Sequence, residues 1–311
     1  MPVGATKIPD LTTRDFLFKE GAKVITVVLG FATSLVYGFA DFFGALSSRK
    51  LKPIFVTLVS GLSGLVFLLL MSPIFGIPAN STAIFWGFLA GLGSAIAITA
   101  LYASLAIGPI SILSPLGAVM SALVPMFFGV WFKGEQFTFF GLLALVGILI
   151  AVGLVGFVPG QDVRLPSPKG LLLGVTAGSF IGLILIFINQ APPDSGVTSV
   201  VVMRAVSATT IGSFVLLGYL IRRNISKREF SVGGKVWLMV ALTGILDSSA
   251  NVFFLFAMRF GSLTVVSVLT ALYPLGTLIL ARIFLKEKIA KVQLAGVLLA
   301  LSCSALLASG I

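Results

Sequence analysis

Residues 91–116, GLGSAIAITALYASLAIGPISILSPL, and residues 244–269, GILDSSANVFFLFAMRFGSLTVVSVL, follow the same pattern 153 positions apart. In each stretch a long apolar segment ends at a glycine, Gly108 or Gly261, and a second apolar segment begins almost at once. Glu135 and Glu287 then follow at nearly the same distance. The chain therefore contains two copies of one module, and the fold of that module determines the fold of the whole.

Ten apolar segments run through the chain, five in each module. A helix needs about 20 apolar residues to cross the hydrocarbon core of a bilayer. Clusters of Lys and Arg or loops rich in Pro, Gly and Asn separate the segments, which lie at about 23–45, 54–75, 83–106, 109–131, 138–158, 169–190, 197–220, 235–258, 262–285 and 291–309. An odd number of spans per module places the two copies in opposite orientations. The sequence therefore predicts an all-α integral membrane protein whose ten transmembrane helices form two inverted five-helix repeats around a central cavity.

The same segments set the expected domain boundaries. We expect an amphipathic N-terminal lead-in over residues 1–22, a first five-helix repeat over 23–158, a linker loop over 159–168 and a second repeat over 169–311. Residues 1–20 carry mixed charge and lack the short apolar core and cleavage site of a signal peptide.

Composition excludes several classes of protein. Hydrophobic residues make up 58% of the 311 and charged residues 10%, whereas about a quarter of a soluble domain is charged. The net charge of +11 comes from short basic runs between apolar segments, which is typical of juxtamembrane charge rather than of nucleic-acid binding. One cysteine and no histidine argue against a metal site. The sequence contains neither GxxxxGK[ST] nor GxSxG, so we expect neither ATP hydrolysis by that route nor an enzyme, and no cofactor.

Three stretches resemble the EamA-type transporters of the drug/metabolite transporter superfamily. They are YGFADFFGALSSRK (37–50), ALYASLAIGPISILSPLGAVMSALVP (100–125) and GILDSSANVFFLFAMRFGSLTVVSVLTALYPLGTLILARIFLKEK (244–288). The resemblance covers nearly all ten segments and implies a basket of helices with a central cavity, alternating access and no ATP hydrolysis. The family includes exporters of amino acids and other metabolites.

The resemblance and the composition together predict a secondary transporter, an exporter of amino acids or similar small polar metabolites. A channel or lipid scramblase and a membrane-embedded enzyme are the alternatives. The expected partners are a small polar solute and the lipid bilayer, with the chain acting as a monomer or a homodimer.

Four charged residues lie within apolar segments: Asp41, Arg204, Asp247 and Arg282. Each costs about 2.5–3.5 kcal/mol at the centre of a spanning helix, so such residues usually face a polar cavity or a partner. Thr243, Asp247 and Asn251 recur every four residues, which places them on one helical face. Asp247 can contact a substrate or carry a proton, or it can be a buried acid that stabilises the helix bundle.

Asp41 follows Tyr37 at the same four-residue spacing. Its carboxylate can face a substrate or pair with nearby basic residues. Arg204 can bind a substrate carboxylate through two hydrogen bonds, but neutralising Asp247 or reaching the membrane interface is the favoured interpretation. Asp247, Asp41 and Arg204 are therefore the candidates for proton coupling or charge pairing.

Hydroxyl-bearing residues in other segments complete the predicted substrate site: Ser94 and Tyr102 in the third, Ser114 in the fourth, Thr270 and Tyr273 in the ninth. Proline removes a backbone donor and frees carbonyl groups, so Pro115, Pro125 and Pro274 are expected to kink their helices. The GxxxGxxxG pattern of Gly174, Gly178 and Gly182 is typical of close helix packing in membranes.

Basic residues give the expected orientation. Thirteen lie on the side opposite the termini and six on the side of the termini. The positive-inside rule then places both termini outside the cytoplasm, whereas the superfamily resemblance implies cytoplasmic termini. We expect a multi-pass protein of a bacterial inner (plasma) membrane.

Overall fold

The computed structural model describes residues 11–107, 110–156, 166–222, 232–284 and 290–309. The first ten residues of the expected lead-in, most of the expected linker loop, and Glu287 lie outside these ranges.

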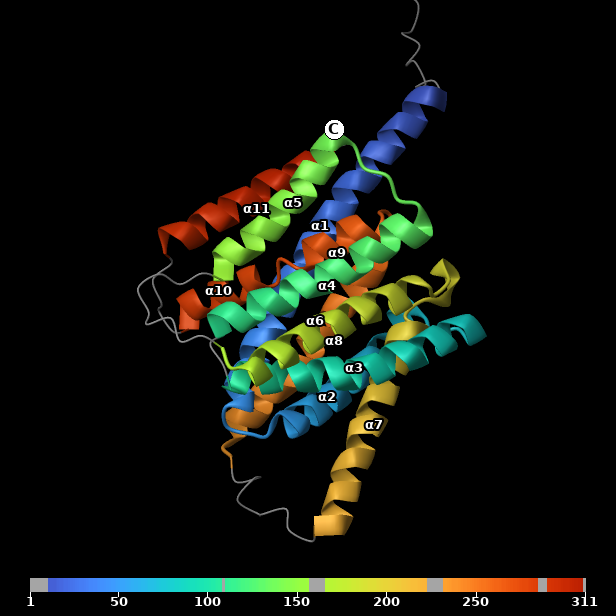
Figure 1. The fold of residues 1–311 in the computed structure, drawn as a ribbon. Coiled ribbons are helices and arrows are strands. Elements are labelled where there is room, and N and C mark those ends of the chain that lie inside the picture. The colour runs from blue at the N-terminus through green and yellow to red at the C-terminus, as the bar shows by residue number, and fades with distance from the viewer. Residues whose placement is uncertain (1–10, 108–109, 157–165, 223–231, 285–289, 310–311) are drawn as a thin grey trace, which may run out of the picture.

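All elements of the described residues are helical (Figure 1). In chain order they are α1 (Leu11–Ser48), α2 (Pro53–Phe75), α3 (Ser81–Ile107), α4 (Ile110–Lys133), α5 (Phe139–Gly156), α6 (Pro168–Asn189), a short 3-10 turn (Pro193–Ser195), α7 (Thr198–Arg222), α8 (Gly234–Ala257), α9 (Leu263–Thr270), α10 (Pro274–Phe284) and α11 (Lys291–Ser309).

Eight of the described helices are long and apolar enough to cross a membrane, with α9 and α10 counted together as Leu263–Phe284. The chain is therefore a multi-pass membrane protein. The fifth and tenth predicted segments form shorter apolar helices, so the expected count of ten is not reached by length. The 18 residues of α5 extend about 27 Å, just under the ~30 Å of a typical hydrocarbon core.

Local sequence explains where several helices begin. The Ser167 hydroxyl accepts a hydrogen bond from Gly170 N at 3.1 Å, which caps α6 directly before Pro168. In the ninth predicted segment, α9 ends at Thr270 and α10 begins at Pro274, since proline has no N–H for the preceding turn. Helix α4 instead continues as one helix through Pro115 and Pro125.

Packing follows the internal repeat. In the two repeats, α1 to α5 correspond in order to α6, α7, α8, α9–α10 and α11. The contacts between helices follow this correspondence. Helix α1 packs on α8 as α6 packs on α3, and α1 packs on α10 as α6 packs on α4. Helices α5 and α11, which match each other, lie side by side (Figure 1). The described helices therefore form two repeats related by an approximate two-fold axis.

Small residues allow these helices to approach closely. A Cβ atom on Gly178 would lie 2.7 Å from Met120 Cβ, and one on Gly182 would lie 2.8 Å from Val124 Cβ, so both glycines lie against α4. Gly174 has ordinary van der Waals space, with 3.4 Å to its nearest neighbour. Gly38 of α1 makes the equivalent contact in the first repeat, where a Cβ atom would lie 2.6 Å from Gly276 Cα. The GxxxG pattern did not reveal this contact.

A carboxylate links the two repeats at the start of α9. Glu135, in the loop after α4, accepts hydrogen bonds from Leu263 N at 2.9 Å and from Thr264 N at 3.1 Å. These are two of the backbone donors that a helix N-terminus leaves without partners, and the negative charge lies at the positive end of the helix dipole. The loop of the first repeat thus caps a helix of the second.

Candidate functional site

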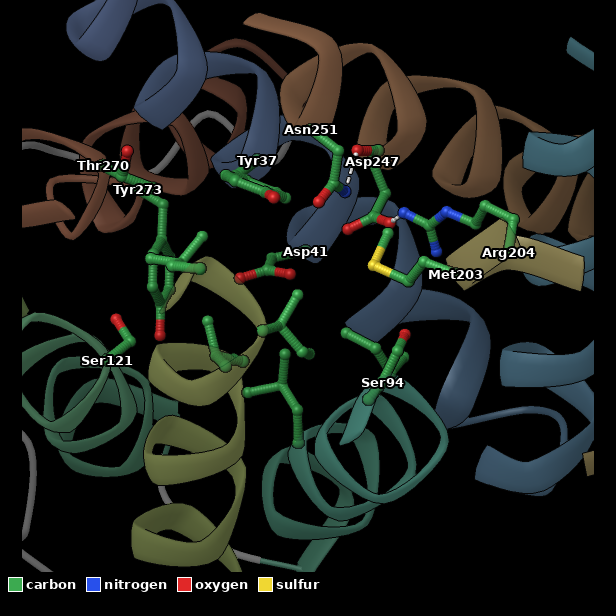
Figure 2. A pocket seen from close by; sticks show the side chains of 15 residues that line it. Tyr37, Asp41, Ser94, Ser121, Met203, Arg204, Asp247, Asn251, Thr270 and Tyr273 are labelled. Atoms are coloured by element: carbon green, nitrogen blue, oxygen red, sulfur yellow. Dashed lines mark hydrogen bonds and ion pairs between the residues drawn. The ribbon is translucent and has the colours of Figure 1, made fainter. Parts of the chain in front are cut away.

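A cavity lies between the two repeats, with an empty volume of about 520 Å³ when its opening is included. Its lining comes from six spanning helices and from α9 with the turn after it: Tyr37, Asp41, Ser94, Ile98, Leu101, Ser121, Ile181, Ile184, Leu185, Met203, Arg204, Asp247, Asn251, Thr270 and Tyr273 (Figure 2).

Eight of the residues singled out in the sequence lie on this one cavity. They are Tyr37, Asp41, Ser94, Arg204, Asp247, Asn251, Thr270 and Tyr273. They come from separate segments of the chain, and the helix packing described above brings them together.

Three other predicted site residues do not belong to the lining. Thr243 is fully buried, and its hydroxyl donates to Met239 O of its own helix at 2.9 Å, so the polar face of α8 reaches the cavity only from Asp247 onward. Tyr102 is buried, and its ring lies next to Gly44. The Ser114 carbonyl accepts a hydrogen bond from the Tyr273 hydroxyl at 3.2 Å, which makes Ser114 a support for a lining residue.

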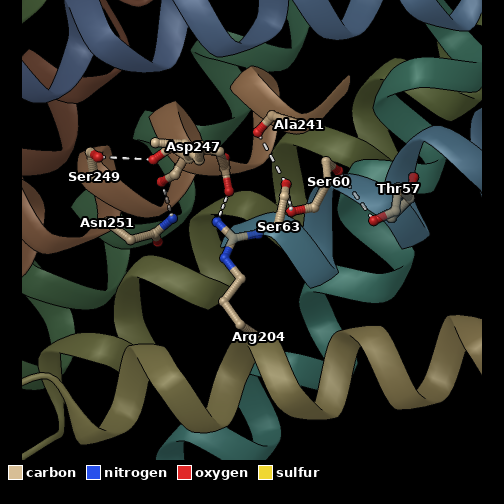
Figure 3. Close-up of polar contacts among 9 residues, drawn as sticks. Thr57, Ser60, Ser63, Arg204, Ala241, Asp247, Ser249 and Asn251 are labelled. Atoms are coloured by element: carbon tan, nitrogen blue, oxygen red, sulfur yellow. Dashed lines mark hydrogen bonds and ion pairs between the residues drawn. The ribbon is translucent and has the colours of Figure 1, made fainter. Parts of the chain in front are cut away.

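Arg204 of α7 forms an ion pair with Asp247 of α8 (Figures 2 and 3). The two side chains are 5% and 13% exposed, so the pair is largely out of water. The Asn251 side-chain amide donates to the backbone carbonyl of Asp247 at 2.8 Å rather than to its carboxylate. Nearby, the Ser63 hydroxyl of α2 donates to Ala241 O at 3.1 Å, a second polar contact made by α8 (Figure 3). Two of the three charges on the cavity therefore neutralise each other.

Asp41 of α1 is the third charge. Among the described residues, none forms a hydrogen bond or ion pair with its carboxylate. The carboxylate shares the cavity with Tyr37 and Tyr273. In the view of Figure 2 it lies between Tyr273 and Asp247. Asp41 is therefore a cavity carboxylate without a compensating cation in the described part of the chain.

Further polar atoms around the cavity also have no partner among the described residues. Thr270 Oγ1 and Asn251 Oδ1 are buried and unbonded. A buried polar group without a partner is costly, so these two atoms are unsatisfied in this structure.

Sequence reasoning missed the apolar part of the lining, Ile181, Ile184 and Leu185 on α6 together with Ile98 and Leu101 on α3. The internal repeat contains a signal for two of them. Ile181 and Leu185 lie 144 residues after Tyr37 and Asp41, so they occupy the matching positions of the second repeat.

The geometry defines a multi-pass membrane protein whose two repeats enclose a cavity with charged side chains in its lining. The model of the EamA-like transporter family matches residues 24–157 and 168–309, one match for each repeat. The chain belongs to the EamA-like transporter family, which is part of the drug/metabolite transporter superfamily.

A solved structure described as "Crystal structure of protein" is similar in fold. It is 15% identical, with a TM-score of 0.70 over 90% of this chain and 95% of that chain. No curated protein matches the chain.

Proposed function

We propose that the chain is a secondary transporter that exports amino acids or similar small polar metabolites by alternating access. The observation that supports this most directly is the cavity between the repeats. Residues of both repeats line it, and it holds Asp41 and the Arg204–Asp247 pair between apolar helices. Buried charges are costly in a membrane and usually mark a solute or ion pathway.

We further propose that α5 and α11 also cross the membrane, which gives five spans per repeat and opposite orientations of the two repeats. The equivalent packing of α1 on α8 and of α6 on α3 supports this arrangement. A site on an approximate two-fold axis can be closed on either side by equivalent movements of the two repeats. Helices α4 and α9–α10 are the proposed moving elements, since Pro115, Pro125 and Pro274 weaken their hydrogen-bond ladders.

Within the site, we propose that the Asp41 carboxylate binds the solute, or binds a proton that is exchanged for the solute. Asp247 is the proposed charge partner of Arg204, because the ion pair occupies its carboxylate. Ser94, Asn251, Thr270 and Tyr37 supply hydrogen bonds to the solute in this proposal, and Tyr273 supplies its ring.

Counterflow in proteoliposomes tests the transport activity. Vesicles loaded with one unlabelled solute are expected to accumulate the same labelled solute, and uptake is expected to saturate. Asp41→Asn is expected to reduce this exchange at least tenfold. The matched control is Asp194→Asn, because Asp194 is an exposed carboxylate in the 3-10 turn. Flux that does not saturate and is not stimulated by internal solute would identify a channel or scramblase instead.

A further inference from the structure

The charges on the cavity do not balance. Arg204 and Asp247 form an ion pair, and Asp41 adds one negative charge with no cation beside it among the described residues. In a membrane interior an uncompensated carboxylate is unfavourable, so a ligand that brings a positive charge is favoured.

Aromatic rings flank the same carboxylate. Tyr37 lies one helical turn before Asp41 on α1, and Tyr273 faces the cavity from the turn after α9. The face of a tyrosine ring attracts a cation. The hydroxyl of Tyr273 already donates to Ser114 O, so this residue offers a solute its ring rather than a free donor. Carboxylate and rings together form a site for an ammonium group.

The cavity offers no comparable site for a carboxylate. Arg204 is the only cation among the described lining residues, and it is paired with Asp247. Its Nε atom is buried and has no hydrogen-bond partner among the described residues. The ion pair uses one guanidinium nitrogen, and a ligand carboxylate at the remaining N–H donors would add a third negative charge beside Asp247 and Asp41 with only one cation to balance them, which is unfavourable away from water.

The remaining wall of the cavity is apolar. Ile181, Ile184 and Leu185 of α6 face the same space as Asp41. A hydrocarbon or aryl group placed against these side chains is removed from water without loss of hydrogen bonds.

We infer that the substrate is a cationic amine with an apolar body and no carboxylate. This inference rests on the proposed transport function. The ammonium group of the amine binds Asp41 between Tyr37 and Tyr273, and the apolar body lies against the α6 wall. Of the amino acids and similar small metabolites proposed above, the inference excludes the amino acids themselves and selects amines of the kind that decarboxylation of apolar amino acids produces.

Matched pairs of compounds test the inference directly. Phenethylamine and phenylalanine differ by one carboxylate, as do tryptamine and tryptophan, and 2-phenylethanol lacks the ammonium group. Binding to the full-length protein in detergent is measured by titration calorimetry. We expect each amine to bind at least tenfold more tightly than its amino acid and than the alcohol. An amino acid that binds as tightly as its amine would overturn the inference.

Variants of Asp41 test whether this residue causes the preference for the amine. Asp41→Asn is expected to lose at least tenfold in amine affinity, Asp41→Glu to keep the preference for the amine, and Asp194→Asn to match the parent protein. Amine binding that is undiminished in a folded Asp41→Asn protein would contradict the assignment. If that variant does not fold, the paired compounds on the parent protein decide the question alone.

Counterflow separates this inference from the proposed function. Exchange of amino acids or anionic solutes without exchange of amines would overturn the amine and leave the transporter standing. Absence of exchange with any solute, while amines still bind in detergent, would overturn transport and leave the binding site standing.

Discussion

Helix α1 and its counterpart α6 face the same cavity, but they present different chemistry to it. Tyr37 and Asp41 of α1 are matched in α6 by Ile181 and Leu185, at the 144-residue spacing that also separates the starts of the two family matches at 24 and 168. A similar contrast exists between Ser94 of α3 and Asp247 of α8, 153 residues apart. One repeat thus supplies an acid where the other supplies an apolar or hydroxyl side chain.

The contrast shows which features the duplication preserves. Residues that allow close packing recur, such as Gly38 in α1 and Gly182 in α6. The cavity lining has diverged, because a lining residue need not pack against a fixed neighbour. The repeats also differ in the pairing of their charges. Arg204 and Asp247 of the second repeat form an ion pair, whereas Asp41 of the first repeat has no partner in the described residues. Substitutions can test each part of this contrast.

The largest expected effect is the loss of the ion pair. Arg204→Met leaves Asp247 as an unpaired, largely buried acid, which typically costs about 3–5 kcal/mol. We expect a large decrease in the unfolding temperature in detergent. The double variant Arg204→Met with Asp247→Leu removes both charges and is expected to recover most of the lost stability. A single variant as stable as the parent protein would mean that Asp247 already has another source of compensation.

The second expected effect compares equivalent glycines. A Cβ on Gly38 meets backbone atoms, with Gly276 Cα at 2.6 Å and Thr277 N at 2.8 Å, whereas a Cβ on Gly182 meets the Val124 and Pro125 side chains, the nearest atom at 2.8 Å. Overpacking typically costs about 1–3 kcal/mol. We expect Gly38→Ala near the top of that range and Gly182→Ala near the bottom, measured by unfolding in detergent. Gly174→Ala, with 3.4 Å of space, is the control. Equal losses at Gly38 and Gly182 would contradict the contrast between backbone and side-chain neighbours.

These substitutions also show how far sequence reasoning reached. The repeat, the apolar segments and the helical class were predictable because hydrophobic length and Gly/Pro punctuation are local properties of the chain. The break before Pro274 lies where a missing backbone donor indicated it. Helix α11 has the expected bounds of 291–309, and α5 begins one residue after the expected start at 138, while the expected end at 158 lies outside the described residues.

The candidate site was predictable only in part. Polar residues on apolar helices are visible in sequence, so Asp41, Asp247 and Asn251 could be singled out. Which of them has a partner depends on how helices distant in sequence are placed, and the Arg204–Asp247 pair was only one of several possibilities. Thr243 has the right helical spacing but lies beyond the cavity, since spacing gives the face of a helix and not the depth. The Ile and Leu side chains of the lining are indistinguishable from ordinary core residues.

The third expected effect concerns the cap that the first repeat supplies to the second. Glu135→Gln keeps one acceptor oxygen but removes the charge that accepts from Leu263 N and Thr264 N. Hydrogen bonds to charged groups contribute about 1.5–3 kcal/mol, and part of that remains with the amide, so we expect a loss of about 1–2 kcal/mol. Hydrogen exchange of the first turn of α9 is expected to rise roughly five- to thirtyfold. Exchange that is unchanged there, or that rises equally in Asp194→Asn, would show that the cap does not limit opening of α9.

The smallest expected effect is at Ser94, the counterpart of Asp247 in the first repeat. Its hydroxyl faces the cavity, and no described residue forms a hydrogen bond with it. A neutral hydrogen bond to a solute contributes about 0.5–1.5 kcal/mol, so Ser94→Ala is expected to weaken solute binding roughly two- to twelvefold and to leave the unfolding temperature unchanged. Titration calorimetry against Asp41→Asn and the parent protein measures the difference. If Ser94→Ala lost more solute affinity than Asp41→Asn, hydrogen bonding rather than charge would select the solute. The difference between the two repeats would then not result from the unpaired charge of Asp41.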